Sequence, residues 1–217
     1  MDKTSPILLA LLANGPVRMD GVTLYRHGNG VRTCKSKRGP KKSRSEGEEQ
    51  SSNQFTEVRK MWRVYRRTTG GLPVWKIWAK ETHAAKSDSA FHSVNGGCLR
   101  PGKGVWAFPT FRFSMGTLEA PVITDVARDG WTVTLRWEND ADRPKASASD
   151  QVYLGYFYNT QPRSPQMITC HNAHRGDGEV TMEIPAAGQP DGTPLHLYLF
   201  FGNENPDRFS PSEYAGI

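Results

Sequence analysis

Lysine and arginine are concentrated in one short segment, residues 32–44, which we call the basic arm. Seven of its thirteen residues are Lys or Arg, none is acidic, and Cys34 is its only hydrophobic residue. Such a segment cannot bury enough surface to fold alone, so we expect a flexible arm that a partner orders. Basic side chains along a surface bind phosphates, and counterion release drives that binding. The candidate contacts in the arm are Arg32, Lys35, Lys37, Arg38, Lys41, Lys42 and Arg44.

A second group of arginines follows on a predicted helix. Ser45 and Glu48 have the capping-box spacing, and Gly70-Gly71 marks the end of the helix. Apolar residues recur at the 3.6-residue period and predict a buried face. They are Phe55, Val58, Trp62 and Tyr65. At about 100° per residue the arginines form a neighbouring stripe that could dock a polyanion beside the arm. The stripe consists of Arg59, Arg63, Arg66 and Arg67.

Both groups predict a polyanion partner, a nucleic acid or a nucleoprotein, contacted with little sequence specificity. No helix-turn-helix, zinc-finger or ribonucleoprotein motif is present, which argues against sequence-specific readout. Trp62 or Tyr65 could stack a base if exposed, although their periodicity places both in the core. Two other interpretations stay open: the arm is a solvated tail, or the acidic half of a second copy neutralises it.

Other residue combinations give weaker indications of chemistry. Cys170, His171 and His174 are metal-capable, but their spacing matches no standard site and a strand running into a turn explains it. Residues 175–177 spell Arg-Gly-Asp, a short match that chance explains in a predicted hairpin turn. The glycines around Lys103 lack the ending of a phosphate loop, and no nucleophile elbow occurs. We therefore predict no enzymatic activity, no metal and no cofactor.

Charge divides the chain near residue 118. Residues 1–118 hold 21 Lys and Arg against 8 Asp and Glu, a net charge of +13, while residues 119–217 hold 7 against 14, a net charge of −7. Such asymmetry indicates two modules with different partners. Hydrophobic residues make up 36% of the chain, a low fraction for a fully packed globule. We predict a basic, less compact module over 1–118 and a well-packed domain over 119–217.

Cysteine usage and the N-terminal residues bear on the compartment. Cys34, Cys98 and Cys170 are too few and too far apart for a disulfide framework, and reduced thiols in a cytosolic protein fit better. The apolar residues 7–13 barely reach the length of a signal-peptide core, and Leu11 would occupy its −3 position. We expect the cytoplasm, with secretion, a cell surface or a virion as alternatives. No apolar run approaches the ~18 residues of a membrane span.

Local patterns predict the elements of the first module. Residues 22–34 are typical of a β-hairpin, with Asn29-Gly30 in its turn. Residues 72–81, which have Pro73 at the first helical position, and residues 87–95 predict two further helices. Residues 106–114 predict a strand at an edge or a bulge, because Pro109 lacks an amide donor.

After Ala120 the sequence pattern changes to one that predicts short strands. The predicted strands are 122–127, 131–137, 151–158, 165–170, 179–184 and 195–202. Strict alternation from Trp131 to Trp137 indicates one buried face. About seven short strands in about 100 residues predict an immunoglobulin- or fibronectin III-like β-sandwich. The Cys–Trp–Cys spacing of true immunoglobulin domains is absent, which favours the fibronectin III type. The predicted fold class is α+β.

Several segments, in their order and spacing, resemble an uncharacterised family common in Bacteroidota, a domain of unknown function. They span nearly the whole chain: 14–16, 21–25, 32–42, 45–59, 89–91, 113–121 and 195–216. The chain departs from the family at the helix start, where a Thr-Pro-x-Gln-like cap is usual and this chain has Ser45-Glu46-Gly47-Glu48. Ser45 and Glu48 still have the spacing of a capping box. The resemblance implies a basic N-terminal region followed by a β-sandwich, and it brings no activity or functional residues.

Together these patterns predict a non-enzymatic binding protein. Its basic module would contact the polyanion, and its β-sandwich would contact another protein. The alternative is a structural or adhesive subunit of a surface or virion assembly, in which the +13 half of one copy pairs with the −7 half of the next. That alternative predicts oligomers that dissociate in salt in the absence of nucleic acid.

Overall fold

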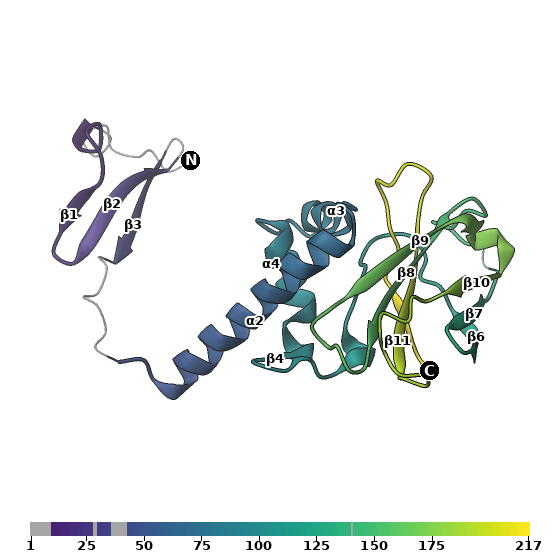
Figure 1. Ribbon diagram of the computed structural model, residues 1–217. Helices are drawn as coiled ribbons and strands as arrows, with labels where there is room; N and C mark the ends of the chain where they lie inside the picture. The colour runs from purple at the N-terminus through teal and green to yellow at the C-terminus, as the bar shows by residue number, and fades with distance from the viewer. Residues whose placement is uncertain (1–9, 28–29, 36–42, 140) are drawn as a thin grey trace. The chain divides into compact units, whose positions relative to one another are not determined.

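The computed structural model describes residues 10–27, 30–35, 43–139 and 141–217 (Figure 1). The chain forms two compact units, Met1–Glu46 and Gly47–Ile217. The expected module boundary after residue 118 therefore falls inside the second unit. This unit begins early in the chain because its helices share one hydrophobic core with the C-terminal sheets.

The first unit contains a three-stranded antiparallel sheet in the order β1 (Val17–Met19), β2 (Val22–His27) and β3 (Gly30–Lys35). Asp20 and Gly21 join β1 to β2 with positive φ angles of 43° and 77°, as a tight hairpin turn requires. The pairing of β2 with β3 confirms the predicted hairpin. Residues 28 and 29 of its turn lie outside the described part of the chain.

Three helices open the second unit, and all three predicted helices are confirmed. They are α2 (Glu46–Thr68), α3 (Val74–Glu81) and α4 (Ser87–Asn95). The buried face of α2 contains Val58, Met61 and Tyr65. Phe55 was predicted to be buried but is 49% exposed. The reason is that the face of α2 that meets the core is centred near Met61, and Phe55 lies at its margin.

The predicted strand over residues 106–114 is wrong. A 3₁₀ turn at Gly96–Cys98 leads into the short strands β4 (Leu99–Arg100) and β5 (Gly104–Val105), and a second 3₁₀ turn spans Phe108–Thr110. Pro109 cannot donate to a strand ladder, so the chain turns there. The phenylalanines of this segment enter the core individually: Phe108, Phe111 and Phe113.

Seven strands form two facing antiparallel sheets. They are β6 (Ile123–Asp129), β7 (Thr132–Trp137), β8 (Gln151–Tyr158), β9 (Gln166–His174), β10 (Glu179–Glu183), β11 (Leu195–Gly202) and β12 (Glu213–Gly216). One sheet has the order β10-β7-β6 and the other β12-β11-β8-β9. This is the three-plus-four arrangement of a fibronectin III-like sandwich, and the α+β fold class is confirmed. The six predicted strands are present; β12 was not predicted.

The four-stranded sheet is buried on both faces, unlike that of a free-standing sandwich. Val152 and Leu154 of β8 pack toward the three-stranded sheet, whereas Tyr153 and Phe157 pack toward the helices. Gly155 also faces the helices, and its missing side chain makes room for the ring of Phe113. The second unit therefore has three layers: helices, four strands and three strands (Figure 1).

Polar contacts fix α2 on this core. The Glu57 carboxylate, only 4% exposed, lies 3.0 Å from Nε of Arg163 in the loop between β8 and β9. The backbone N–H of Gly102 donates to the other carboxylate oxygen at 3.3 Å. Gln54 donates from Nε2 to the carbonyl oxygens of Gly96 and Leu99. These bonds hold the exposed face of α2 in one orientation.

Candidate polyanion-binding groove

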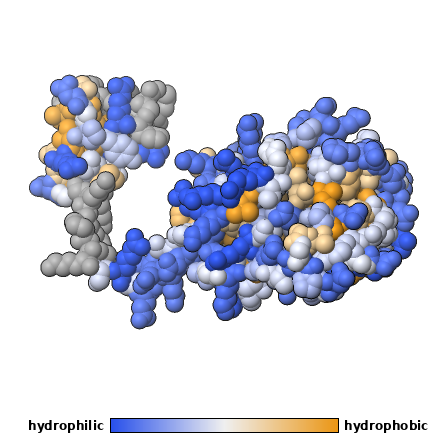
Figure 2. All heavy atoms as spheres, in the orientation of Figure 1, coloured by the Kyte–Doolittle hydropathy of each residue, from blue (hydrophilic) through white to orange (hydrophobic). Residues whose placement is uncertain are grey.

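The arginine stripe predicted from the sequence is present on α2. Arg59, Arg63, Arg66 and Arg67 are all exposed. The guanidinium carbon of Arg59 lies 5.6 Å from the centre of the Phe55 ring, a cation–π contact on the same helix. Figure 2 shows that hydrophilic side chains cover most of α2. The C-terminal half of α2 therefore presents a basic surface with aromatic rings beside the charges, whereas Glu46, Glu48 and Glu49 are exposed at the beginning of the helix.

Trp62 is the centre of this surface. Among the described residues, three hollows adjoin its side chain, and together with the stripe we call them the α2 groove. One of about 520 Å³ is lined with Arg63, Arg66 and Arg67, and a smaller one of about 150 Å³ lies between Trp62 and Phe55. Trp62 was predicted to be a core residue, but its indole is only partly buried. The groove thus offers an aromatic ring with cations around it.

Neighbouring aromatic rings hold Trp62 in place. Its ring stacks on Tyr65 with the centroids 5.9 Å apart and the planes 14° apart, and it packs against Phe91 at 5.2 Å. The Tyr65 hydroxyl donates to the carbonyl oxygen of Phe113 at 2.7 Å. Burial raises the pKa of Tyr65 well above its usual value, so this donor keeps its proton. A ligand would therefore meet a prearranged indole.

The structure does not bring all predicted contacts together. Arg32 is exposed on β3, which belongs to the first unit, whereas the α2 groove belongs to the second. The backbone of Lys35 ends β3, and Arg44 is exposed just before α2. The remaining arm residues lie outside the described part of the chain: Lys37, Arg38, Lys41 and Lys42.

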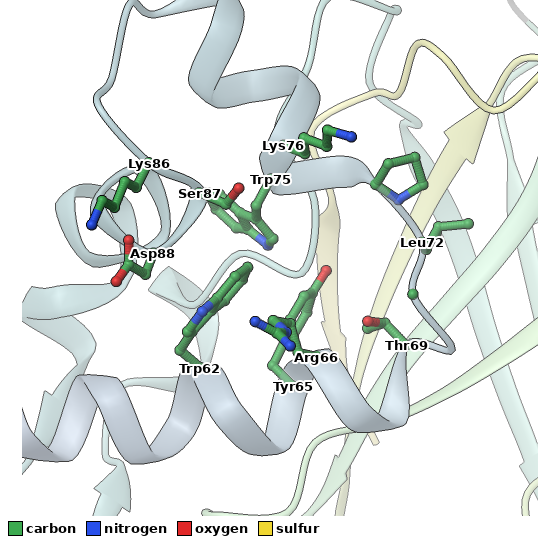
Figure 3. Close-up of a pocket in the computed structure, with 12 residues that line it drawn as sticks. Trp62, Tyr65, Arg66, Thr69, Leu72, Trp75, Lys76, Lys86, Ser87 and Asp88 are labelled. Carbon is green, nitrogen blue, oxygen red and sulfur yellow. The ribbon is translucent and has the colours of Figure 1, made fainter.

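Two basic residues of the α2 groove were not predicted. Lys76 at the start of α3 and Lys86 before α4 line the largest hollow next to Trp62, with a volume of about 600 Å³ (Figure 3). They are 10 and 20 residues from Arg66 in sequence, and no local pattern joins them to the stripe. Only the packing of three helices places them at one cavity.

The Arg-Gly-Asp tripeptide has a structural role at its arginine. The Arg175 side chain is fully buried, and its Nε lies 3.0 Å from the carboxylate of Asp150. Its Nη2 donates to the carbonyl oxygen of Glu119 at 2.7 Å, and its guanidinium lies 4.0 Å from the Phe201 ring centre. A buried arginine cannot be offered to a receptor.

Neither a metal centre nor a membrane segment is evident in what the structure describes. No group of three His, Cys, Asp or Glu side chains there is close enough to hold an ion. His171 is exposed, and the Cys170 sulfur lies 4.0 Å from that of Met182. Within the same residues, no helix has both the length and the apolar character that crossing a bilayer requires.

No protein-family model and no curated protein matches the chain. A crystal structure of the FN1–FN3 domains of chicken CNTN1 is 14% identical, with a TM-score of 0.33, over 48% of this chain and 33% of that chain. A computationally redesigned β-sandwich protein is 12% identical, with a TM-score of 0.32, over 46% and 94% of the two chains. The matched part spans about a third of the CNTN1 fragment. The fibronectin III-like class is defined by the strand order described above.

Proposed function

We propose that this chain is a non-catalytic binding protein whose α2 groove contacts a polyanion, the backbone of a nucleic acid or nucleoprotein, with little sequence specificity. The observation that carries the proposal is a partly exposed Trp62 held among exposed arginines of one helix. Arginines bind phosphates of any sequence and release their counterions. An aromatic face stacks on any base. A flexible single strand can satisfy both contacts along one helix.

The basic arm extends the same proposal. Its seven basic residues lie immediately before α2 in the sequence. Each basic residue that neutralises a phosphate adds to the salt dependence of binding. The arm would therefore strengthen binding without adding specificity, and the α2 groove would supply the ordered contacts.

Contact with a second protein would use the sheet that the helices leave open. In the described second unit, the outer face of β10-β7-β6 is such a surface, because both faces of the other sheet are buried. Arg136 at its centre is bound by Asp125 at 2.8 Å and Glu179 at 3.1 Å. Asp129 and Glu183 flank Thr132 on the same face, beyond the uncharged row of Ala127, Thr134 and Thr181.

This acidic outer face favours the second candidate function, head-to-tail self-association through the basic half of another copy. Its net charge is opposite to that of the arm and the α2 groove. Salt screens attraction between exposed charges that are farther apart than the Debye length, which is about 8 Å at physiological salt. Light scattering in the absence of nucleic acid should then detect oligomers that dissociate as salt increases, whereas a monomer at all salt concentrations would exclude this candidate.

The test of polyanion binding is a salt titration with single-stranded RNA and DNA of mixed sequence. The double variant Arg59→Glu and Arg63→Glu should lose most of the affinity and part of the salt slope. The variant Lys80→Glu and Lys103→Glu changes the charge equally at exposed positions outside the groove and is the matched control. Equal losses in the two variants would show that net charge, and not the groove, accounts for binding.

A further inference from the structure

One edge strand of the sandwich carries no charge. The two sheets have four edge strands, β10 and β6 in one and β12 and β9 in the other (Figure 1). An edge strand presents unpaired backbone N–H and C=O groups to other chains, and charged side chains along the edge discourage such pairing. β9 contains no Asp, Glu, Lys or Arg in its nine residues. The other three edge strands each carry acidic residues: Glu179 and Glu183, Asp125 and Asp129, and Glu213.

The outer edge of β9 has a regular stretch of five residues. Within the described residues, β9 pairs only with β8, from Gln166 opposite Tyr156 to Cys170 opposite Val152. Alternate residues of an antiparallel strand direct their N–H and C=O groups away from the partner strand. Residues 171–173 then form a bulge, because the next pair joins His174 to Gln151. Pairing with another chain is therefore confined to residues 166–170.

A hollow adjoins this stretch. It has a volume of about 570 Å³, and residues of β9, of β10 and of the turn between them line it. The hydrophobic side chains of Ile168, Cys170 and Met182 line the hollow and are only partly buried. Ile168 and Cys170 are on the face of β9 that packs against the three-stranded sheet. Pairing along β9 would cover these side chains and remove apolar surface from water.

Charges at the two ends of β9 favour a second copy as the occupant. Arg163 lies just before β9 and is about half exposed, although its Nε also contacts Glu57. Asp177 follows the strand and is also about half exposed. In antiparallel pairing of two β9 strands, the start of one strand lies beside the end of the other, so the arginine of each copy approaches the aspartate of its partner. Parallel pairing would bring like charges together.

We propose that two copies of this chain pair antiparallel through β9 about a two-fold axis, which joins their four-stranded sheets into one sheet of eight strands. Only one register pairs all five regular residues: Ile168 lies opposite Ile168, Met167 opposite Thr169, and Gln166 opposite Cys170. Directly opposite residues project from the same face of a sheet. The two Ile168 side chains therefore meet beside the hollows, and the uncharged edges cover each other.

This dimer is independent of polyanion binding, and it differs from the head-to-tail candidate in its response to salt. Sedimentation velocity on the full-length protein, in reducing buffer without nucleic acid, tests it over a range of protein concentrations. A small interface of this kind should give a dimer with a Kd of about 10–100 µM. The dimer should persist from about 50 to 500 mM salt, because backbone hydrogen bonds and apolar contacts are not screened.

A charge placed on the edge should break the dimer. Thr169→Lys puts a cation on β9 of each copy, two positions apart across the axis, and should weaken dimerisation at least about tenfold. Thr124→Lys is the matched control, since Thr124 is an exposed residue of β6, an edge strand of the other sheet. It should leave the Kd unchanged. Thermal unfolding of both variants confirms that they are folded.

A disulfide measures the register. Gln166→Cys, made together with Cys34→Ser to remove an exposed thiol, places a thiol opposite Cys170 of the second copy. Oxidation should then give a covalent dimer that a reductant reverses. The same two positions within one chain are about 13 Å apart along the strand, beyond the ~7 Å limit between Cα atoms for a disulfide. Adding Cys170→Ser should abolish the covalent dimer.

A monomer at about 100 µM in both low and high salt would overturn the dimer, because this concentration reaches the expected Kd. Oligomers that dissociate as salt increases would also overturn it and would support the head-to-tail candidate. A salt-resistant dimer that survives Thr169→Lys would show that β9 is not the interface and that another surface or partner strand is involved. Loss of the dimer in Thr169→Lys without crosslinking through Gln166→Cys would overturn the register.

Discussion

Replacing Gly155 with Ala should destabilise the second unit, because the added Cβ enters the space of the Phe113 ring. A Cβ placed on Gly155 lies 2.3 Å from Cδ1 and Cγ of Phe113. Carbon atoms in contact normally stay about 3.5–4.0 Å apart, so the ring must move by more than about 1 Å. Phe113 is fully buried, and Phe111 and Tyr198 pack against it. Overpacking of this kind costs about 1–3 kcal/mol, and the close contact places this site in the upper part of that range.

Urea unfolding followed by tryptophan fluorescence measures the effect. We expect a loss of about 2–3 kcal/mol in the free energy of unfolding. In thermal unfolding, the midpoint temperature of a unit of this size should fall by about 4–12 °C. Gly97→Ala is the matched control, since its added Cβ meets nothing within 4 Å and its φ is not positive. A loss below about 0.5 kcal/mol in Gly155→Ala would refute the packing of the helical layer on this sheet face.

Three further predictions follow from buried or charged groups. Arg175→Ala leaves the Asp150 carboxylate buried without its partner, so it should cost about 3–5 kcal/mol, whereas Arg208→Ala at an exposed pair should cost little in the same urea assay. Burial lowers the pKa of His196 from 6.5 to about 4, so as the pH falls the unfolded chain binds a proton before the folded chain does. The contribution of His196 to the free energy of unfolding should therefore be constant above pH 6.5 and should fall by about 1–2 kcal/mol towards pH 4. The variant His196→Gln should flatten this decline. Charge reversal in the basic arm should weaken RNA binding and reduce the salt slope by up to about 3 without changing thermal stability. The reversed positions are Lys37, Arg38, Lys41 and Lys42.

Local patterns in the sequence were sufficient to predict most of the helices and strands. Capping residues and periodicity predicted α2, and turn residues separated the strands of the sandwich. The segment around Pro109 was mispredicted because its aromatic residues resemble a strand, whereas their partners lie on β8 and β11. β12 escaped prediction because its four residues carry little alternation. Uninterrupted burial along β8 depends on a second layer of helices, which no local rule reveals.

The candidate site was only half predictable. Basic residues and their helical spacing identified the stripe on α2, since charge and periodicity are properties of the sequence. The exposure of Trp62 and the approach of Lys76 and Lys86 depend on how α3 and α4 pack against α2. Such features appear only when segments distant in sequence meet.

The most direct test of the central claim is the affinity for single-stranded RNA measured across a series of salt concentrations. If the groove contacts about four phosphates, the logarithm of the binding constant should fall with the logarithm of salt with a slope near −3. Arg59→Glu with Arg63→Glu should make that slope shallower, while the Lys80 and Lys103 control keeps it. Binding that is absent at low salt, or that has the same slope in all three proteins, would contradict the account.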